Sequence, residues 1–594
     1  MENKSNVIGG QFLTTQTDKN NVFIPEQFDE EQKMIAGSCK DFLEAEVLPI
    51  LDEIDKNEPG LMRSLVQKAG ELGLLGISVP AEYEGFGQSF VTSMLASEVL
   101  GAGYSFAVAY SAHTGIGSLP TLYYGTEEQK QKYIPKIATG EWAAAYCLTE
   151  PNAGSDANSG TTRAVLSECG KYYILNGQKM WITNGGFADL LTVFAKIDND
   201  RILSAFLVER NYEGVSFNVE EKKMGIKGSS TVQIFFDNCK VPVENLLGKR
   251  GEGFRIALSI LHVGRMKLGG NVTGASKLSI TNSVKYANER KQFGSLIANY
   301  GAIKHKLGEQ AIRVFVTESA VYRCSNDVDT LAKINLSSGM DKSKATIEAI
   351  AELAIEAAIL KVFASESLDF IVDETVQIMG GMGYSAEAPG DRAYRDSRIN
   401  RIFEGTNEIN RLVVLDTTVK KYKKGDFDLL GLANKTEEEI KNNQYISIPS
   451  EYYAEKKAYL ENYRKAIAIV LTKAQECLKR EFGSEQEVMM NISDMIIQLY
   501  AAESVVLRAE KLEEMNNPKA SLYKEIASAF VYDAADKIRK SAKDAINAYA
   551  IDNTELQSLL LKGVNKLTEV NPVNTKEIRR NVANLIIEEN KYCI

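Results

Sequence analysis

Two segments of this chain carry residue types suited to holding a ring-shaped or anionic ligand. Ala145–Asp156 is rich in small, hydroxyl and turn-forming residues, which present backbone NH groups to an anionic or carbonyl-rich ligand. Met180–Gly186 sets Trp181 near Thr183, so that an indole face could stack on a ring while a hydroxyl bonds to its heteroatoms. An ordinary loop and a core tryptophan are the alternative interpretations.

Two further segments are of interest: one contains a carboxylate that could react, and the other could let the backbone come close to a ligand. Arg401–Ile409 sets Glu404 between bulky apolar residues and a glycine, although a surface turn would have the same composition. Gln377–Tyr384 follows a long helical pattern, and its glycines allow close backbone approach or simply end that helix. Gly251–Ala257 has the spacing of a dinucleotide-binding loop but follows a polar loop instead of a buried strand, so we reject that interpretation.

The elements that must position these residues change type along the chain. Apolar residues recur at helical spacing before residue 144 and after residue 250, whereas β-rich segments with turn signals lie between. We therefore expect a mainly α fold with a central, small β-barrel-like domain, a four-helix bundle and an extra C-terminal helical domain. The expected divisions are a helical domain 1–143, a β domain 144–250, a helical bundle 251–422, a linker 423–449 and a helical domain 450–594.

Several local predictions follow from short patterns. Thr126 with Gln129, and Ser484 with Glu487, have the spacing of capping boxes that open helices. Residues 171–183 contain an Asn-Gly turn between β-rich flanks, and residues 231–243 form another strand. Residues 347–372 form one long bundle helix, and Asn516, Asn517 and Pro518 end a helix in the C-terminal region.

Composition excludes several classes of function. Three isolated histidines and seven scattered cysteines without a CxxC pair argue against a metal site and a disulfide framework. A net charge of −10 opposes general nucleic-acid binding. No apolar run is long enough to span a membrane, and the first residues lack a targeting pattern, so we expect a cytoplasmic protein.

Taken together and in this order, the four segments and ERKQFG (Glu289–Gly294) resemble the acyl-CoA dehydrogenase family. The resemblance covers residues 27–422, and the helical extension makes the chain look like the very-long-chain branch. It implies FAD between the β domain and the bundle. The flavin would contact Tyr146, Leu148, Thr149, Ser155, Trp181, Ile182 and Thr183. A neighbouring subunit would share the distal FAD site, at Arg290, Phe293, Gln377, Gly380 and Gly381, which implies at least a homodimer. Thr406 and Glu408 would also touch FAD, although the family often has glutamine in place of Glu408.

The resemblance also assigns the chemistry. Glu404 matches the family's base, which removes the pro-R α proton of an acyl-CoA while a hydride leaves the β carbon for flavin N5. Enclosure by Ile402, Phe403 and the acyl chain would raise its pKa. The flavin ribityl hydroxyl and the Glu404 amide would polarise the thioester oxygen. Some relatives carry the base at the position of Gly264, which has no carboxylate here. The substrate region would include Ser155, His262, Val263, Gly264 and Arg265, with a helix-surface arginine as the alternative for the last.

Substrate length and partners are the remaining expectations. The small side chains of residues 105–118, including Ala112, would leave a deep tunnel for a long acyl tail, although helix packing could also explain them. Such an enzyme would catalyse the first step of β-oxidation and pass electrons to electron-transfer flavoprotein. An acyl-CoA oxidase and a non-catalytic assembly protein of the same fold are the alternatives. The C-terminal domain could pack across the dimer, contact a membrane surface or recruit another β-oxidation enzyme.

Overall fold

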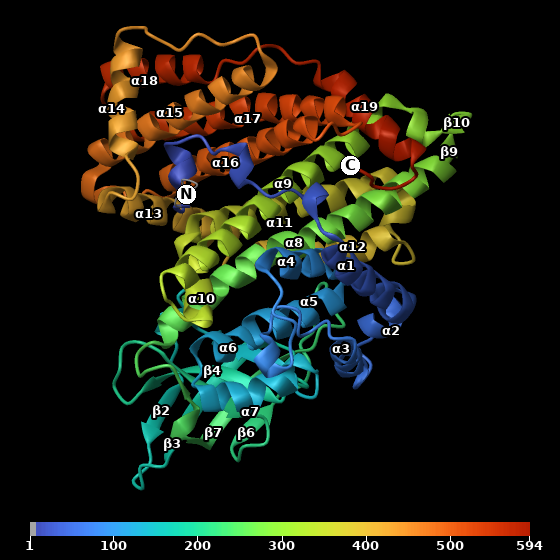
Figure 1. The fold of residues 1–594 in the computed structure, drawn as a ribbon, viewed down its shortest axis with the longest axis vertical. Coiled ribbons are helices and arrows are strands. Elements are labelled where there is room, and N and C mark those ends of the chain that lie inside the picture. Colours follow the sequence, from blue (N-terminus) through green and yellow to red (C-terminus); the bar gives the residue numbers. More distant parts are fainter. Residues whose placement is uncertain (1–6) are drawn as a thin grey trace.

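The computed structural model describes residues 7–594. Figure 1 shows the β domain at one end, the C-terminal helices at the other and the long bundle helices between them, with the first helices beside the bundle. This arrangement confirms the predicted mainly α fold with a central β domain. Within the described residues, no helix is long and apolar enough to cross a membrane.

The first helical region packs between the β domain and the bundle (Figure 1). Its helices are α1 (Glu30–Phe42), α2 (Leu51–Asp55), α3 (Leu61–Glu71), α4 (Phe90–Leu100), α5 (Ser105–Ser111), α6 (Leu119–Tyr124) and α7 (Glu127–Ala138). A π-helical turn, Ala112–Gly117, continues α5. The predicted capping box at α7 is confirmed, because Thr126 accepts from the NH of Gln129 and the Gln129 side chain accepts from the NH of Thr126.

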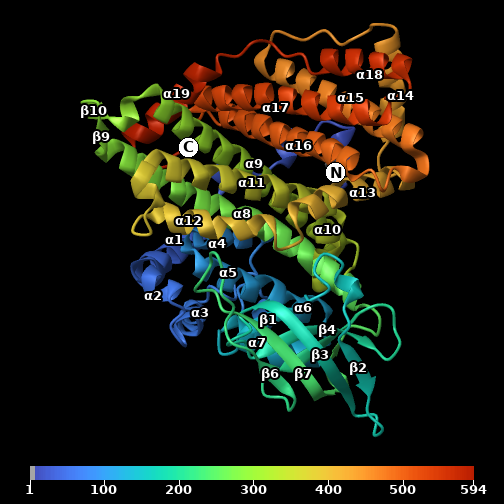
Figure 2. The same cartoon turned by 180° about the vertical axis from the view of Figure 1, so that it is seen from behind.

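The β domain is one sheet in the order β6-β7-β3-β2-β4-β5-β8, with β1 paired to β4. Figure 2 shows this sheet from behind. Its strands are β1 (Ala144–Cys147), β2 (Arg163–Leu166), β3 (Tyr172–Thr183), β4 (Leu190–Ile197), β5 (Ser204–Glu209), β6 (Val215–Phe217), β7 (Thr231–Pro242) and β8 (Leu246–Leu247). The β7 strand agrees with the strand predicted at residues 231–243.

The Asn-Gly pair predicted to make a turn is instead a bulge within β3. The strand continues through Asn176 and Gly177, and its register with β7 shifts between Leu175 and Gly177. Gly177 has φ 150°, and a Cβ there would lie 2.6 Å from Thr162 Oγ1. Glycine is therefore required for a bulge against a neighbouring strand, not for a hairpin turn.

The bundle contains four long helices and two short ones. They are α8 (Gly253–Glu289), α9 (Gly301–Ser337), α10 (Lys342–Glu352), α11 (Ala354–Met379), α12 (Pro389–Ser397) and α13 (Asn407–Lys424), with a small hairpin of β9 (Lys291–Gln292) and β10 (Ser295–Leu296). The single helix predicted for residues 347–372 is broken at Leu353. The N-terminal segment packs at this break, where the NH groups of Gly9 and Gly10 donate to Glu352 and Glu356.

The C-terminal region differs from expectation in two places. The expected linker contains α14 (Leu429–Lys441), whose buried Leu429 and Ile440 pack against later helices. The predicted capping box at Ser484 is absent, because its hydroxyl donates to the carbonyl of Glu481 and Glu485 takes the N-cap position. The remaining helices are α15 (Tyr452–Leu478), α16 (Gln486–Glu514), α17 (Ala520–Tyr549), α18 (Thr554–Leu567) and α19 (Thr575–Glu588). The gap between α16 and α17 contains the predicted Asn-Asn-Pro stop.

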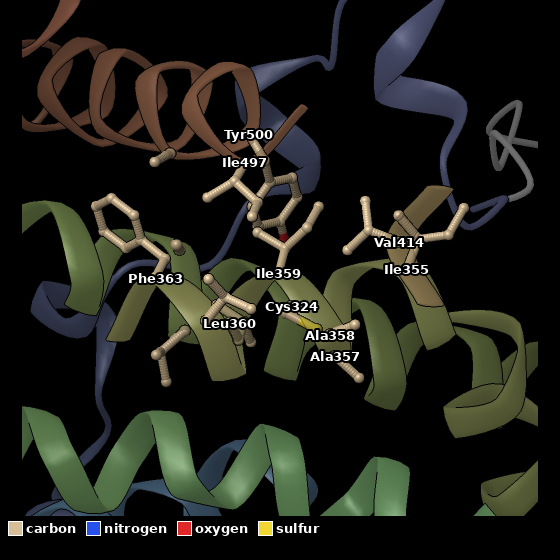
Figure 3. Close-up of a cluster of buried hydrophobic side chains, with 14 of the residues drawn as sticks. Cys324, Ile355, Ala357, Ala358, Ile359, Leu360, Phe363, Val414, Ile497 and Tyr500 are labelled. Carbon is tan, nitrogen blue, oxygen red and sulfur yellow. The ribbon is translucent and has the colours of Figure 1, made fainter. Parts of the chain in front are cut away.

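The C-terminal helices share one apolar core with the bundle. Figure 3 shows Ile359 and Phe363 of α11 beneath Ile497 and Tyr500 of α16. Charged groups also cross this boundary: the buried Glu503 on α16 pairs with Arg464 on α15 and Arg323 on α9. The C-terminal domain is therefore an integral part of the folded chain.

Candidate functional site

An elongated cavity lies between the first helical region and the bundle. One wall is a face of α8 that runs from Gly264 to Ser279. The opposite wall comes from α5 and its π-helical turn, where Ala107, Ala112 and Gly115 keep the cavity open. We call this space the central cavity. Its walls are largely apolar.

Glu404 closes one end of the central cavity. It lies in the loop before α13 with a left-handed backbone, φ 58°, and an ideal Cβ on Gly264 would be 2.6 Å from its Oε2. Only a residue without a side chain at position 264 leaves room for the carboxyl there. Oε2 is buried and has no hydrogen-bond partner in the described part of the chain. Burial raises the pKa of Glu404 to about 7, against the charges of Arg265 and Lys361.

The backbone around Glu404 is held by side chains from two helices. The buried Arg265 donates from Nε to the Glu404 carbonyl at 3.0 Å. Asn410 Nδ2 donates to the carbonyls of Gly405 (2.8 Å) and Thr406 (3.0 Å). The Thr406 hydroxyl accepts from the NH of Ile409 and so caps α13. These contacts fix the loop without using the Glu404 carboxyl.

A second buried cation, Lys361 of α11, lies near the same carboxyl. Its ammonium donates to Asn407 Oδ1 at 2.5 Å, three residues after Glu404. Burial lowers the pKa of Lys361 to about 7, against the charge of Glu404. Asn407 also donates to Ser365 and Glu366, so α11 and the start of α13 are joined here.

The predicted cofactor residues of the β domain differ in their surroundings. Thr183 lines the cavity together with Glu404. Tyr146 and Leu148 are buried, and Tyr146 donates its hydroxyl to the carbonyl of Ala257 on α8 at 3.3 Å. Trp181 has φ 61° and leaves 54% of its surface exposed. An exposed indole held in a strained backbone is typical of a ligand site instead of a packed core.

A buried ion pair supports the loop that carries Leu148 and Thr149. Lys179 donates to the carbonyl of Leu148 (3.2 Å) and to Glu150 Oε1 (2.6 Å). Although burial opposes it, the charge of Lys179 lowers the pKa of Glu150 to about 2. The Thr149 carbonyl accepts from the NH of Met180, which ties the loop to β3.

The other predicted residues lie apart from the central cavity. Ser155 and Glu408 are exposed. The residues assigned to the distal cofactor site, Arg290, Phe293, Gln377, Gly380 and Gly381, are all exposed and none lines the cavity. Phe293 leaves 96% of its surface open.

Two predicted side chains cannot make the contacts expected of them. The Ile182 side chain is buried in the core of the β domain, so only its backbone can touch a cofactor. Val263 is fully buried in the bundle core and does not line the cavity. His262 is half-buried beside Arg265, and burial together with that charge lowers its pKa to about 3.

Sequence reasoning missed Lys361, Asn407, Asn410 and Lys267. The signal for Lys361 is a single lysine in the apolar run 357–364, a position at which a charge must have a buried partner. Asn407 and Asn410 lie in or beside the segment already chosen for Glu404. Lys267 lines the cavity one helical turn after Gly264.

Comparison with known proteins identifies the class to which this fold and site belong. The chain matches the acyl-CoA dehydrogenase N-terminal domain over residues 29–141, the middle domain over 145–239 and the C-terminal domain over 251–418. A further acyl-CoA dehydrogenase C-terminal domain matches residues 462–566. The chain therefore belongs to the acyl-CoA dehydrogenase family of enzymes.

Individual relatives cover nearly the whole chain. A probable acyl-CoA dehydrogenase of Bacillus subtilis is 43% identical over 594 residues, covering 99% of this chain and 98% of its own length. The mitochondrial very long-chain specific acyl-CoA dehydrogenase of Rattus norvegicus is 36% identical, covering 91% of this chain and 84% of its own. A crystal structure of a Bacillus anthracis acyl-CoA dehydrogenase complexed with FAD matches with TM-score 0.95 and 43% identity, over 99% of this chain and 100% of that one.

Proposed function

We propose that this protein binds FAD and oxidises long-chain fatty acyl-CoA to the trans-2-enoyl thioester, with Glu404 as the base. The observation that carries the proposal is the position of the Glu404 carboxyl, which lies over Gly264 at the end of an apolar cavity and has a pKa of about 7. A base with a pKa near the working pH combines adequate strength with adequate deprotonation.

Residues of the β domain suit a flavin. Trp181 offers an exposed aromatic face, and Thr183 adds a hydroxyl at the cavity wall. Tyr146, Leu148 and Thr149 would complete this face, and Ser155 would approach from the loop. When bound, FAD supplies the hydride acceptor. The FAD-bound relative from Bacillus anthracis supports this assignment.

Glu404 can take the α proton because its carboxyl is not committed elsewhere. No described residue donates a hydrogen bond to either of its oxygens, and the backbone NH of Glu404 likewise has no acceptor in the described chain. That NH is free to donate to a thioester oxygen and stabilise the negative charge that develops when the proton leaves. Arg265 and Asn410 hold the loop in this orientation.

The length of the central cavity favours long acyl chains. Its α8 wall runs from Gly264 to Ser279, and these fifteen residue-to-residue steps span about 22 Å at about 1.5 Å per step. An extended hydrocarbon chain advances about 1.25 Å per carbon, so this wall matches about seventeen carbons. The resemblance to a very long-chain specific relative points the same way.

The exposed distal residues support a homodimer. Arg290, Phe293, Gln377, Gly380 and Gly381 could complete the cofactor site of a neighbouring subunit, which explains why an aromatic side chain is left almost fully open. We assign electron-transfer flavoprotein as the electron acceptor. The seven free cysteines fit a cytoplasmic location.

Anaerobic titration of the purified flavoprotein with acyl-CoA of four, eight, sixteen and twenty carbons tests the proposal. We expect the flavin absorbance near 450 nm to bleach mainly with the two longer substrates. If none of them bleaches a bound flavin, the proposed reaction is wrong. Stoichiometric peroxide formed in air would identify an oxidase instead.

A further inference from the structure

Lys267 on α8 is a buried cation that no described residue neutralises. Its side chain is 5% exposed and lines the central cavity, one helical turn after Gly264. No hydrogen bond, ion pair or aromatic contact to Lys267 is found among the described residues. Burial lowers its pKa to about 8. A lone ammonium on the wall of a hydrocarbon tunnel is unfavourable unless a ligand provides an acceptor.

Besides Glu404, two residues with an unpaired acceptor share the cavity with Lys267. Asn271, one turn further along α8, donates through Nδ2 to Ser111 Oγ at 2.7 Å, which leaves its Oδ1 buried and without a donor. Asp396 is also buried, and its Oδ2 has no partner. Apart from Glu404, the wall therefore offers one donor and two acceptors that an unsubstituted alkyl chain would leave unsatisfied.

We propose that the central cavity is built for acyl chains that carry a hydroxyl group, which accepts a hydrogen bond from Lys267 and donates one to Asn271. This inference rests on the proposed function and specifies its substrate class. A hydroxyl is donor and acceptor at once, so a single group satisfies both side chains. A carboxylate would meet Lys267 but would also face the bare oxygens of Asn271 and Asp396.

The helix geometry places this hydroxyl along the chain. Lys267 and Asn271 lie about 4.5 and 10.5 Å beyond Gly264 along α8, at about 1.5 Å per residue. If the reacting carbons 2 and 3 lie at Gly264, where Glu404 is seated, the polar wall faces about carbons 6 to 11 at about 1.25 Å per carbon. The segment beyond, lined by Val272, Ala275 and Leu278, is apolar and suits the remaining tail.

The test measures kcat/KM for two pairs of substrates. One pair is 10-hydroxyoctadecanoyl-CoA and octadecanoyl-CoA, and the other is decanedioyl-CoA and decanoyl-CoA. We expect the wild type to prefer the hydroxylated chain over octadecanoyl-CoA by about tenfold, the effect of one good hydrogen bond to a charged group. Lys267→Met should abolish this preference and improve octadecanoyl-CoA turnover, whereas Lys267→Arg should keep the preference. Asn271→Leu should also reduce the preference for the hydroxylated chain, and it tests the inference even if the Lys267 variants do not fold.

Lys285→Met is the matched control, because Lys285 is an exposed lysine on the same helix. An unchanged ratio between hydroxylated and plain chains in Lys267→Met and Asn271→Leu overturns the inference, as does equal use of both chains by the wild type. A preference for decanedioyl-CoA over both decanoyl-CoA and the hydroxylated chain would also overturn it, in favour of an anion subsite. If no acyl-CoA is oxidised at all, the proposed function itself is wrong. This outcome differs from an unchanged ratio of kcat/KM between hydroxylated and plain chains, which contradicts only the further inference.

Discussion

Replacing Gly264 with alanine would put a methyl group directly against the proposed base. An ideal Cβ at this position lies 2.6 Å from Glu404 Oε2 and 2.8 Å from its Cδ. Ordinary contacts begin at 3.4 Å, so the carboxyl must retreat by about 0.8 Å. Displacement of a catalytic group by about 1 Å can cost about a hundredfold in rate, and we expect a loss of that order.

Stability should change in the opposite direction from activity. Residue 264 lies inside α8, where alanine is favoured over glycine by up to about 1 kcal/mol. The displaced atoms belong to the end of a side chain, so the helix itself need not distort. We therefore expect a thermal midpoint equal to or above that of the wild type, with FAD retained. The assay is the anaerobic rate of flavin reduction by saturating hexadecanoyl-CoA in a stopped-flow instrument.

Gly269→Ala is the control for this substitution on the same helix. Its Cβ would lie 3.0 Å from Val321 Cγ2 and does not approach Glu404. We expect turnover within a few-fold of the wild type. Should folded, FAD-bound Gly264→Ala reduce its flavin at the wild-type rate, either the carboxyl is not seated over residue 264 or another group is the base.

The remaining predictions concern the charges around Glu404 and at the domain boundary. Glu404→Gln should lower turnover by about 10²-fold to 10⁴-fold while the flavin spectrum stays intact. In the wild type, kcat/KM should rise with pH through about 7, because the base acts in its deprotonated form. Lys361→Met should move this inflection to higher pH, because it removes a positive charge that lowers the Glu404 pKa. Since folding raises the Glu404 pKa from 4.5 to about 7, the wild type should lose stability relative to Glu404→Gln as pH rises through 7, and the difference should be smallest below 4.5. Arg464→Met should destabilise the protein by about 3–5 kcal/mol in chemical denaturation, because it leaves Glu503 buried with an incomplete set of partners; a midpoint equal to that of the wild type would contradict this.

Periodicity in the sequence predicted the order of helical and β regions because it depends on which face of each element is buried. Features that depend on a distant partner were predicted less well. Asn176-Gly177 has the local signature of a hairpin, yet pairing with β7 along the whole of β3 converts it into a bulge. The break at Leu353 coincides with the N-terminal segment, more than three hundred residues away in sequence, that packs against it. No local pattern carries that information.

At the site, too, features of the local sequence could be predicted, whereas features that depend on distant partners could not. The segments containing Glu404, Trp181 and Thr183 could be singled out from their residue types, but their roles were assigned only through the resemblance to the acyl-CoA dehydrogenase family. Lys267 could not be told apart from other lysines of amphipathic helices, and the only sequence signal for Lys361 is its place in the apolar run 357–364. What distinguishes Lys267 is the lack of a partner, and what distinguishes Lys361 is the proximity of a carboxyl on another element. Both properties exist only in the folded chain.

Positive charges lie near Glu404, but none of them forms a hydrogen bond with its carboxyl oxygens. Arg265 approaches the base but donates to its backbone carbonyl, and Lys361 is held by Asn407. Both charges therefore lower the Glu404 pKa from outside hydrogen-bond contact with its carboxyl, while burial raises it. A direct salt bridge would lower the pKa by a further one to three units and occupy an oxygen that must receive the proton. Nearby cations that do not bond to the carboxyl keep the Glu404 pKa near 7 and leave Oε2 free. This balance explains why a polar network surrounds the loop yet does not bond to the one group that must react.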